Sequence, residues 1–517
     1  MKIWLTEINA YNPATLTEVT LRYCSGRGLT TKPSETPANT TYQPRILQPA
    51  LVRRDLPIPG STTSATRLSY GELTLSNADG TLDFLTGYDF SGRTITIRAG
   101  EENGAYPAGY PVQLAAVVDT VQVGMTEVAV KIKSPRINWE QPVATLTYGG
   151  TNAVGGTGVD GDASLAGTAK PLVVGYSAPM VPVLVNSFYH IYQYNVPAVL
   201  WRITPVAAQV EVDDGGIALL AGPTYADSTA MYDDVSLWGA TIGYRLCPSE
   251  GLIRLRVAPT FTLSCRLTPP TTLFNCLDAL IHGPGGVTGT GYVQYLSAGY
   301  MSMVANLIAY SGAVITSGKT LAQVMDDFTL PAGCWWGFTA AGALQIGCYL
   351  YDLAVAATAT LTLNEIISFE RDTAPLYWRV ILRNNHNVAV QTSGLAPSAT
   401  AETKQAFARQ WNEMIMANPA FQTRHPAAGE FVAETMLYQS TAALPTLWPA
   451  TLQGSGAGRE ILKITARMDA PGVALLDLGK VAIIKMPRLG YAAGKSFLVC
   501  GIQTDAVKNR VDLTLWG

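Results

Sequence analysis

Three oxygen-bearing side chains gather around one turn near the start of the sequence. Asn77, Asp79 and Asp83 lie within seven residues, around the dipeptide Asp79-Gly80. Carboxylates and amides at this spacing are the ligand types of a calcium loop. Alignment with such a loop, however, puts Leu75 at its first position and Thr86 at its last, where acidic ligands are required. The pattern therefore predicts a turn between two strands and no metal site.

Strands of alternating apolar and polar residues are expected on both sides of this turn. Asp83 is a candidate to brace the turn or to pair with Arg93, and both interpretations stay open. The dipeptide Gly92-Arg93 would open the second strand. Side chains alternate across a strand, so the apolar residues of each strand share one face. They are Leu73, Leu75, Ile95 and Ile97.

The segment AVITSGKT, residues 313–320, fits a loose phosphate-loop pattern, and a strand ending at Asp477 imitates its acidic partner. The β-branched residues of this segment resist the positive φ angles that direct backbone N–H groups at phosphate. Phosphate loops also belong to parallel βαβ arrays, for which the chain has too few helices. Thr320 and Gln323 instead form a capping box, which predicts the start of a helix.

No pattern typical of a hydrolytic enzyme is present. The four histidines occur in neither a GxSxG elbow nor an HExxH helix. The acidic pairs at 233–234 and 326–327 are adjacent in sequence, so their side chains point apart and make poor acid and base partners. Two glycine-rich stretches, 283–291 and 454–459, are predicted to be hairpin loops. We expect no catalytic residue, no cofactor and no metal, and hence a protein that is not an enzyme.

The cysteines and the tryptophans each leave one alternative open. The seven cysteines form no CxxC pair and have apolar neighbours, so buried thiols are preferred over an iron–sulfur cluster. The segment CWWGF carries Trp335 and Trp336 as candidate interaction aromatics, because flat rings stack on sugars. Packing of these rings in the core beside the preceding helix is the preferred interpretation.

The composition excludes several classes of partner. Only 14% of the 517 residues are charged, and the net charge is −3. No block of Lys and Arg could follow a phosphate backbone, so we expect no sequence-specific nucleic acid binding. No apolar run approaches about 18 residues, and we expect neither a membrane span nor a classical export signal. The low charge suits broad contacts with other proteins.

The elements that must position these residues are mostly strands. TEVTLRYC and TEVAVKIK alternate with period two, and the final segment RVDLTLW is expected to be a paired strand. Apolar residues at helical spacing predict three helices, over 271–283, 320–328 and about 399–417. The predicted fold class is mainly β with a few short helices (a β-rich α+β chain), built from several antiparallel β-sandwich or barrel domains.

Changes in composition divide the chain into five parts. We expect an N-terminal β domain over 1–147, a Gly-rich linker over 148–171 and a second β domain over 172–268. A small helix-strand domain would follow over 269–350. A C-terminal β domain, with one inserted helix at about 399–417, would complete the chain over 351–517.

Four segments resemble the tail-hub and baseplate proteins of long-tailed bacteriophages. The first is RLSYGELTLSNADGTLDFLTGYDFSGRTITIRAG, which is similar to their strand, N-x-DG-x-LD turn and G-R-x-x-x-I strand. LAGTAKPLVVGYSAPMVPVLVN, TLAQVMDDFTLPAGCWWGFTAAGALQIG and the ending GKSFLVCGIQTDAVKNRVDLTLWG look like three further passages of that family. The marker residues of the resemblance are Asn77, Asp79, Gly80, Asp83, Gly92 and Arg93.

The resemblance implies a structural virion protein at the distal end of a phage tail, assembled in the host cytoplasm. Copies of the chain would form a hub ring around the DNA exit channel, with a trimer favoured and a hexamer as the alternative. Its partners would be distal-tail, tail-tube, tape-measure and fibre proteins. The alternative function is a distal-tail or receptor-binding component that recognises host-surface glycans.

Overall fold

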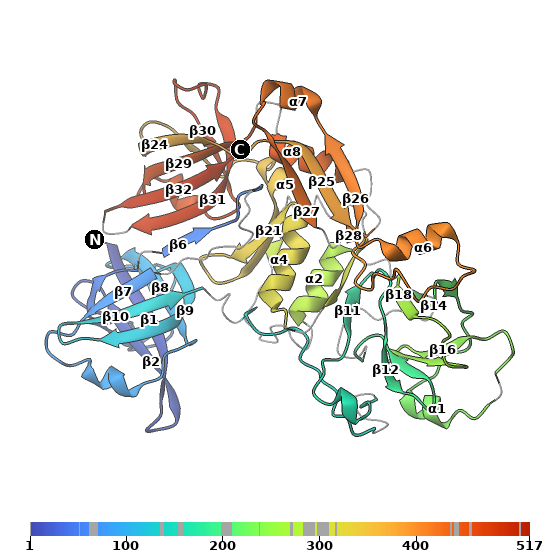
Figure 1. Ribbon diagram of the computed structural model, residues 1–517. Helices are drawn as coiled ribbons and strands as arrows, with labels where there is room; N and C mark the ends of the chain where they lie inside the picture. Colours follow the sequence, from blue (N-terminus) through green and yellow to red (C-terminus); the bar gives the residue numbers. More distant parts are fainter. Residues whose placement is uncertain are drawn as a thin grey trace.

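A computed structural model describes residues 2–50, 52–60, 71–134, 139–152, 159–197, 209–236, 238–268, 272–282, 295–296, 310–315, 318–434, 437–438, 444–453, 458–505 and 508–517. Strands predominate in these residues, and they form seven sheets with short helices between them (Figure 1). The predicted fold class, mainly β with a few short helices, is confirmed. No helix of the described residues is long and apolar enough to cross a membrane.

The N-terminal part folds into a nine-stranded sheet in the order β3-β4-β2-β1-β8-β9-β10-β7-β5. Alternation places its apolar residues on one side, as in β10, where Val128, Val130 and Ile132 are buried. The turn that carries Asn77, Asp79, Gly80 and Asp83, here called the marker turn, joins β7 to the segment that leads into β8. The strands are β1 (Lys2–Asn12), β2 (Thr17–Cys24), β3 (Leu29–Thr30), β4 (Thr41–Pro44), β5 (Ile46–Gln48), β7 (Gly71–Ser76), β8 (Thr94–Glu101), β9 (Val112–Val123) and β10 (Glu127–Lys133).

The C-terminal sheet has seven strands, and one of them comes from the N-terminal part of the chain. The order is β23-β30-β31-β32-β29-β24, and β6 pairs with β31. The last strand, β32, lies between β31 and β29, so the predicted pairing of the final segment is confirmed. The strands are β6 (Val52–Asp55), β23 (Ala359–Leu361), β24 (Ile366–Thr373), β29 (Glu460–Arg467), β30 (Val481–Ile484), β31 (Lys495–Asp505) and β32 (Arg510–Trp516).

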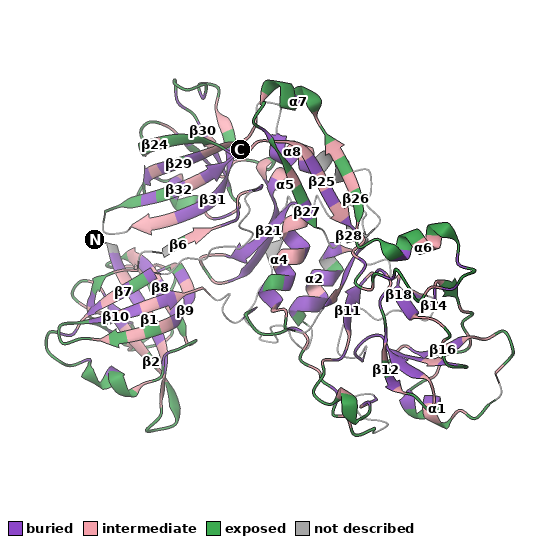
Figure 2. Cartoon of the chain, viewed as in Figure 1, coloured by how far each residue is buried: buried purple, intermediate pink, exposed green. Residues whose placement is uncertain are grey.

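Three small sheets and several helices share one central core (Figure 2). The predicted capping box is confirmed, because Thr320 and Gln323 form it at the start of α4, and α2 ends at His282. The sheets are β11-β20-β28, β19-β22-β21 and β26-β25-β27. Their elements are β11 (Leu172–Gly175), β19 (Tyr295–Leu296), β20 (Tyr310–Ile315), β21 (Cys334–Phe338), β22 (Leu344–Cys348), β25 (Tyr377–Asn384), β26 (Asn412–Ala417), β27 (Gly429–Glu434), β28 (Leu437–Tyr438), α2 (Leu273–His282), α4 (Leu321–Thr329), α5 (Tyr349–Leu353), α7 (Pro419–Arg424) and α8 (Leu444–Gln453). Helix α6 (Ala401–Ala408) lies outside this core, beside Gly216.

The block between residues 172 and 268 adds two further sheets, β12-β13-β17-β16 and β15-β14-β18. It extends away from the other β sheets and lies at the lower right of Figure 1. Its elements are β12 (Val183–Asn186), β13 (Ile191–Gln193), β14 (Val210–Asp214), β15 (Ile217–Ala218), β16 (Tyr244–Cys247), β17 (Leu252–Leu255), β18 (Leu263–Leu267) and α1 (Ser228–Asp233).

The single helix predicted over 399–417 is wrong in its second half. Helix α6 ends at Ala408, and residues 412–417 form strand β26. Met414 and Met416 pack against the central core, whereas the intervening Ile415 is 51% exposed. That alternation has the period of a strand, and pairing with β25 decides between the two periods. The same region also holds α7 and α8, so it contains more than one helix.

The segment 148–171, predicted to be a Gly-rich extended linker or loop, is a compact loop in its described residues. Tyr148 is buried and forms a bridge with Ala166. The Asp160 carboxylate accepts hydrogen bonds from the backbone N–H of Gly149 (2.6 Å) and of Thr151 (3.2 Å). These contacts close the loop on itself, which glycine content alone does not reveal.

The expected separation into consecutive domains also differs from the structure. Strand β6, from the N-terminal part, belongs to the C-terminal sheet. The central core joins residues of 269–350 to Val380, Trp448 and Leu452, so the small helix-strand region has no core of its own. Contacts between distant segments, which composition does not record, set these groupings.

Candidate functional site

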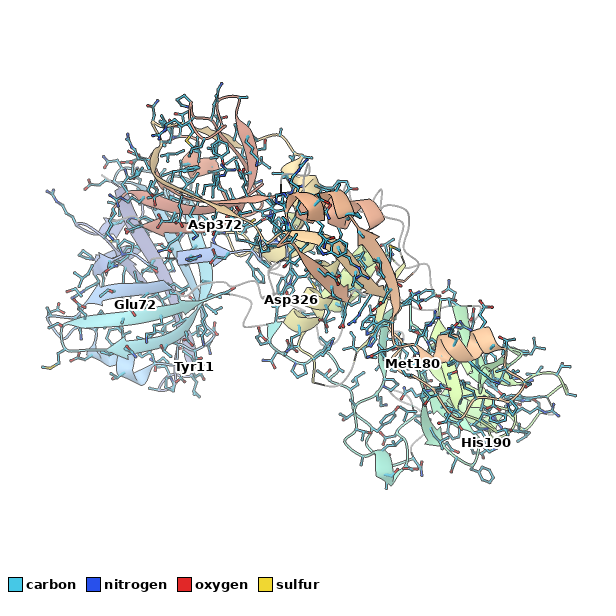
Figure 3. The ribbon with its side chains drawn as sticks, turned by 45° about the horizontal axis from the view of Figure 1, so that its top comes forward. Tyr11, Glu72, Met180, His190, Asp326 and Asp372 are labelled. Atoms are coloured by element: carbon cyan, nitrogen blue, oxygen red, sulfur yellow. The ribbon has the colours of Figure 1, made fainter. Side chains whose placement is uncertain are left out.

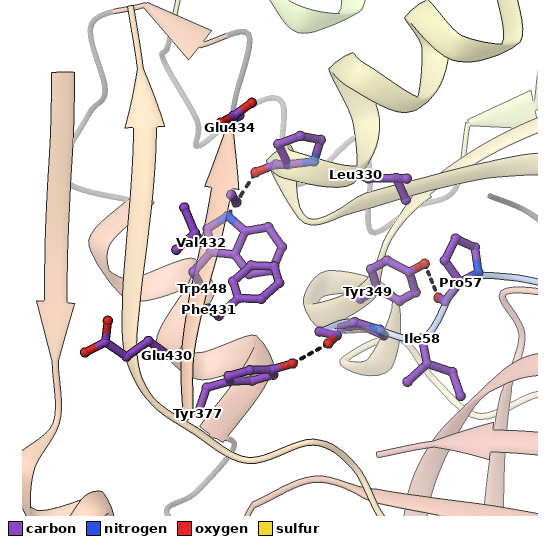
Figure 4. Close-up of a pocket in the computed structure, with 14 residues that line it drawn as sticks. Pro57, Ile58, Leu330, Tyr349, Tyr377, Glu430, Phe431, Val432, Glu434 and Trp448 are labelled. Atoms are coloured by element: carbon purple, nitrogen blue, oxygen red, sulfur yellow. Dashed lines mark hydrogen bonds between the residues drawn. The ribbon is translucent and has the colours of Figure 1, made fainter. Parts of the chain in front are cut away.

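The main pocket of the described residues lies between strand β27 and a segment from the N-terminal part of the chain. It has a volume of about 520 Å³ and is lined by residues 430–434, by 57–60 and by side chains from α5, β25 and α8 (Figure 4). Residues 57–60, here called the strap, directly follow β6. The crossing of β6 to the C-terminal sheet therefore helps to bring the strap to this pocket.

Two tyrosine hydroxyls hold the strap in place. Tyr377 donates a hydrogen bond to the carbonyl of Gly60 (2.5 Å), and Tyr349 donates one to the carbonyl of Pro57 (Figure 4). Gly60 has a φ of +82°, and a Cβ there would lie 2.7 Å from the Tyr377 ring. Only glycine fits this position without movement of the tyrosine. Burial raises the pKa of both tyrosines, so their hydroxyls remain protonated donors.

Aromatic rings form the wall opposite the strap. The Phe431 ring lies 5.0 Å from the Trp448 ring and 5.3 Å from the Tyr377 ring. Trp448 is buried, and its indole N–H donates to the carbonyl of Pro331 (2.9 Å). The rings are thus fixed by packing and by a hydrogen bond, and they present an apolar surface to the pocket.

The charged groups that line this pocket are two carboxylates. Glu430 pairs with Arg379 (2.9 Å), and Glu434 pairs with Arg383 (3.2 Å), whose guanidinium also contacts Glu413 (3.0 Å). The arginines lie on β25 and do not line the pocket. Apolar walls with carboxylates at the rim can bind apolar or basic groups, and among the described residues that line the pocket no nucleophile has a neighbouring base.

The marker turn is built around a buried amide. The Asn77 side chain accepts from the N–H of Leu82 (2.8 Å) and donates to Asp83 (2.8 Å) and to the carbonyl of Gly124 (2.9 Å). Asp83 therefore braces the turn through Asn77. The pairing with Arg93 is wrong, because Arg93 pairs with Glu18.

Asp79, Gly80 and Gly92 lie in turns between the strands of the same sheet. Asp79 receives two hydrogen bonds from Arg45, at 2.7 and 2.8 Å, and this guanidinium holds the pKa of the carboxyl well below its usual range. Gly80 and Gly92 have φ angles of +67° and +74°, which suit glycine in turns. The described residues contain no group of three or more metal-ligating side chains.

Trp335 and Trp336 are both fully buried, so the interpretation of them as an exposed platform for sugars is wrong. Successive side chains of β21 point to opposite faces, and the two indoles belong to different hydrophobic cores. Trp335 donates to Asp352 (2.9 Å) and Trp336 donates to Asp326 (2.7 Å). Core packing, the preferred interpretation, is what the structure shows.

The first three residues of the phosphate-loop pattern form part of a strand, not a loop. Residues 313–315 belong to β20, Lys319 pairs with Asp327 (2.6 Å), and Asp477 pairs with Arg54 (2.7 Å). The two acids of the 326–327 pair thus contact different partners, as their adjacency predicts. The glycine-rich stretches 283–291 and 454–457 lie outside the described residues.

The remaining titratable residues are dispersed. Figure 3 shows His190 at the outer end of the 172–268 block and Asp326 in the middle of the molecule. His386 stacks on Trp411, with ring centroids 4.0 Å apart, and burial lowers its pKa. All seven cysteines are buried free thiols, which agrees with the preferred interpretation of them.

Sequence reasoning missed the pocket residues. Tyr349, Tyr377, Phe431 and Trp448 are far apart in sequence and match no motif. The segment LPIPG at 56–60 carries a local signal, since two prolines and a glycine mark an exposed turn or strap. The sequence of that segment does not indicate which strand it faces in the fold.

Comparisons with known proteins find similarity in structure alone. No protein-family model matches the chain, and no curated protein matches it in sequence. The prophage tail protein gp18 from Listeria monocytogenes EGD-e is 7% identical, with a TM-score of 0.41, and the match covers 100% of this chain and 94% of that one.

Two further solved structures are similar to a comparable degree. The 43 kDa tail protein of prophage MuSo2 from Shewanella oneidensis is 7% identical, with a TM-score of 0.40 and coverage of 100% of this chain and 98% of that one. The tail protein from Neisseria meningitidis MC58 is 9% identical, with a TM-score of 0.37 and coverage of 90% and 91%. Two of these three structures are thus prophage tail proteins, and the third is described as a tail protein.

Proposed function

We propose that this chain is a structural protein of a bacteriophage tail tip, and that copies of it form a hub ring around the DNA exit channel. A trimer is favoured and a hexamer is the alternative. The protein would be assembled in the host cytoplasm and would reside at the distal end of the tail in the virion. It would act by docking distal-tail, tail-tube, tape-measure and fibre proteins, and it would catalyse no reaction.

The observation that carries the proposal is the place of the four resembling segments in the fold. The first contributes β7 and β8, the second β11 and β12, the third α4, β21 and β22, and the last β31 and β32. Each segment is therefore built into a sheet, and together they span the molecule from end to end. A net charge of −3 adds support, because a weakly negative channel wall would not retain passing DNA.

The glycan-recognition alternative receives no support from the residues considered for it. Trp335 and Trp336 are 0% exposed and cannot stack on a sugar without unfolding of β21. No other observation favours this alternative over a tail-tip scaffold.

Electron microscopy of purified virions, with the chain labelled by a C-terminal antibody fragment, tests the proposal. We expect label on the tail axis at the distal tip, in three copies or six. Label on flexible peripheral fibres, or its absence from the particle, would overturn the hub assignment. Light scattering of the purified protein provides the stoichiometry independently.

A further inference from the structure

Strand β27 has one edge that pairs with nothing in the described part of the chain. The sheet order is β26-β25-β27, so β25 occupies one side of β27. The backbone of residues 430–434 makes no hydrogen bond to any other described segment. An edge of this kind presents N–H and C=O groups that can template a further strand.

This free edge faces the pocket. Five consecutive residues, 430–434, line it, although successive side chains of a strand point to opposite faces. Side chains on a single face could account for only every second residue. The strand therefore approaches the pocket along its edge, and Figure 4 shows the strap residues Pro57 and Ile58 across the pocket from Val432.

The strap does not act as the missing neighbour of β27. Pro57 and Pro59 have no backbone N–H, and the carbonyls of Pro57 and Gly60 accept hydrogen bonds from tyrosines. An open space of about 520 Å³ is left between the strap and the strand. It has apolar walls at Ile58, Phe431 and Trp448.

The charge of the rim restricts what can occupy this space. Glu430 and Glu434 are 41% and 53% exposed, and they are the charged residues that line the pocket. Both carboxylates pair with arginines of β25 that do not line the pocket, so the negative charge on the pocket side is partly compensated. An apolar occupant with basic ends is therefore favoured over an acidic one, in polarity and to a smaller degree in charge.

We propose that the pocket receives an extended segment of another protein chain, which adds to β27 as a fourth strand of the β26-β25-β27 sheet. An apolar side chain of this segment packs against Phe431 and Trp448, and basic residues at its ends face Glu430 and Glu434. Main-chain pairing supplies affinity and the pocket supplies selectivity, as in other cases of strand addition. We take the chain that donates this segment to be a neighbouring tail protein. That identification rests on the proposed function, whereas the binding mode does not.

Fluorescence anisotropy of the full chain with the peptide Lys-Val-Thr-Leu-Thr-Val-Lys tests the binding mode. Two versions carry N-methyl groups on alternate sets of amides. One set faces β27, so its methylation should weaken binding at least about ten-fold through the loss of several hydrogen bonds. The other set faces outward, and its methylation should change affinity less than about two-fold. Equal effects of the two sets, or no binding of the parent peptide, would overturn the proposal.

A matched pair of variants tests the charge of the rim. Glu434 and Glu413 both pair with Arg383, but only Glu434 lines this pocket. Glu434→Gln should weaken the basic peptide about three-fold, and Glu413→Gln should leave it unchanged. A peptide with Glu at both ends should bind more weakly than the basic one; equal losses in the two variants would contradict the assignment.

Two further outcomes separate this inference from its alternatives. Self-association of the chain that the peptide reverses would identify a second copy as the occupant and would overturn the assignment to a different chain. If virions carry the protein on the tail axis but the purified chain binds none of the peptides, this inference is overturned and the proposed function stands.

Discussion

Asn77 is the residue on which the marker turn depends most. Its amide satisfies a buried N–H at Leu82 and a carbonyl at Gly124, and it holds Asp83 in position. Asn77→Ala should lower the free energy of unfolding by about 1–3 kcal/mol, because the buried N–H of Leu82 loses its acceptor. Asp83→Ala, at an exposed position, should cost no more than about 1 kcal/mol. Urea denaturation measures both, and a dependence of either on calcium would contradict a purely structural turn.

Asp79 links the same turn to pH. Its pKa in the folded chain is lowered from the usual 3.8, first of all by hydrogen bonds from Arg45. A lowered pKa means that the pair stabilises the fold above the unfolded value near pH 4 and that this contribution is lost as the pH falls below it. Wild type should therefore lose more stability between pH 5 and about pH 2 than Asp79→Asn does. Parallel acid titrations of the two proteins would reveal no difference if Arg45 did not hold the carboxylate.

At the scale of elements, β6 is attached to the C-terminal sheet by a small number of contacts. Arg54 pairs with Asp477 (2.7 Å) with only 12% of its side chain exposed, and Leu56 is buried beyond it. Gly501, opposite Asp55, leaves the space for this approach, because a Cβ there would lie 2.4 Å from the Asp55 carboxylate. The attachment of β6 to the C-terminal sheet thus depends on the Arg54–Asp477 pair, on buried Leu56 and on the space at Gly501.

Arg54→Ala should detach β6 without unfolding either sheet. Hydrogen exchange of residues 52–56 and 501–504 should become at least about ten-fold faster, since a partly buried ion pair and the pairing that it supports are lost. Arg53→Ala is the matched control, because Arg53 is 54% exposed and pairs with Asp55 on its own strand. Equal effects of the two changes would show that the pair with Asp477 does not hold the strand.

Across the whole molecule, β21 couples two hydrophobic cores. Trp335 packs in the C-terminal core and Trp336 in the central core, although they are neighbours in sequence. Trp335→Ala and Trp336→Ala should each cost about 3–5 kcal/mol and should raise hydrogen exchange in both cores. Leu73→Ala, in the separate core of the first sheet, should act on that sheet alone. Loss of protection in a single core after either tryptophan change would show that the cores unfold independently.

Local patterns in the sequence predict much of this fold and little of the pocket. The capping box at Thr320 and the alternation in β10 depend on neighbours within a few residues, so they can be recognised directly. Residues 412–417 and strand β6 take their conformation from partners far away in the chain, which propensity does not include. The pocket lies between the strap and β27, which are likewise far apart in the sequence. Its residues therefore form no motif.

The crossing of β6 also sets an order for biosynthesis. The partner of β6 is β31, which begins at Lys495, so a ribosome must add 440 residues after Asp55 before the pair can form. At about 5–20 residues per second this takes roughly 20–90 seconds, during which β6, and with it the strap, has no partner strand in the C-terminal sheet. A chain truncated before Lys495 would lack the strand that anchors β6 beside the strap. Pairing of β6 is consequently a sign that β31 has been synthesised, and a partner that recognises the anchored strap would select chains that contain β31 over fragments that end before it.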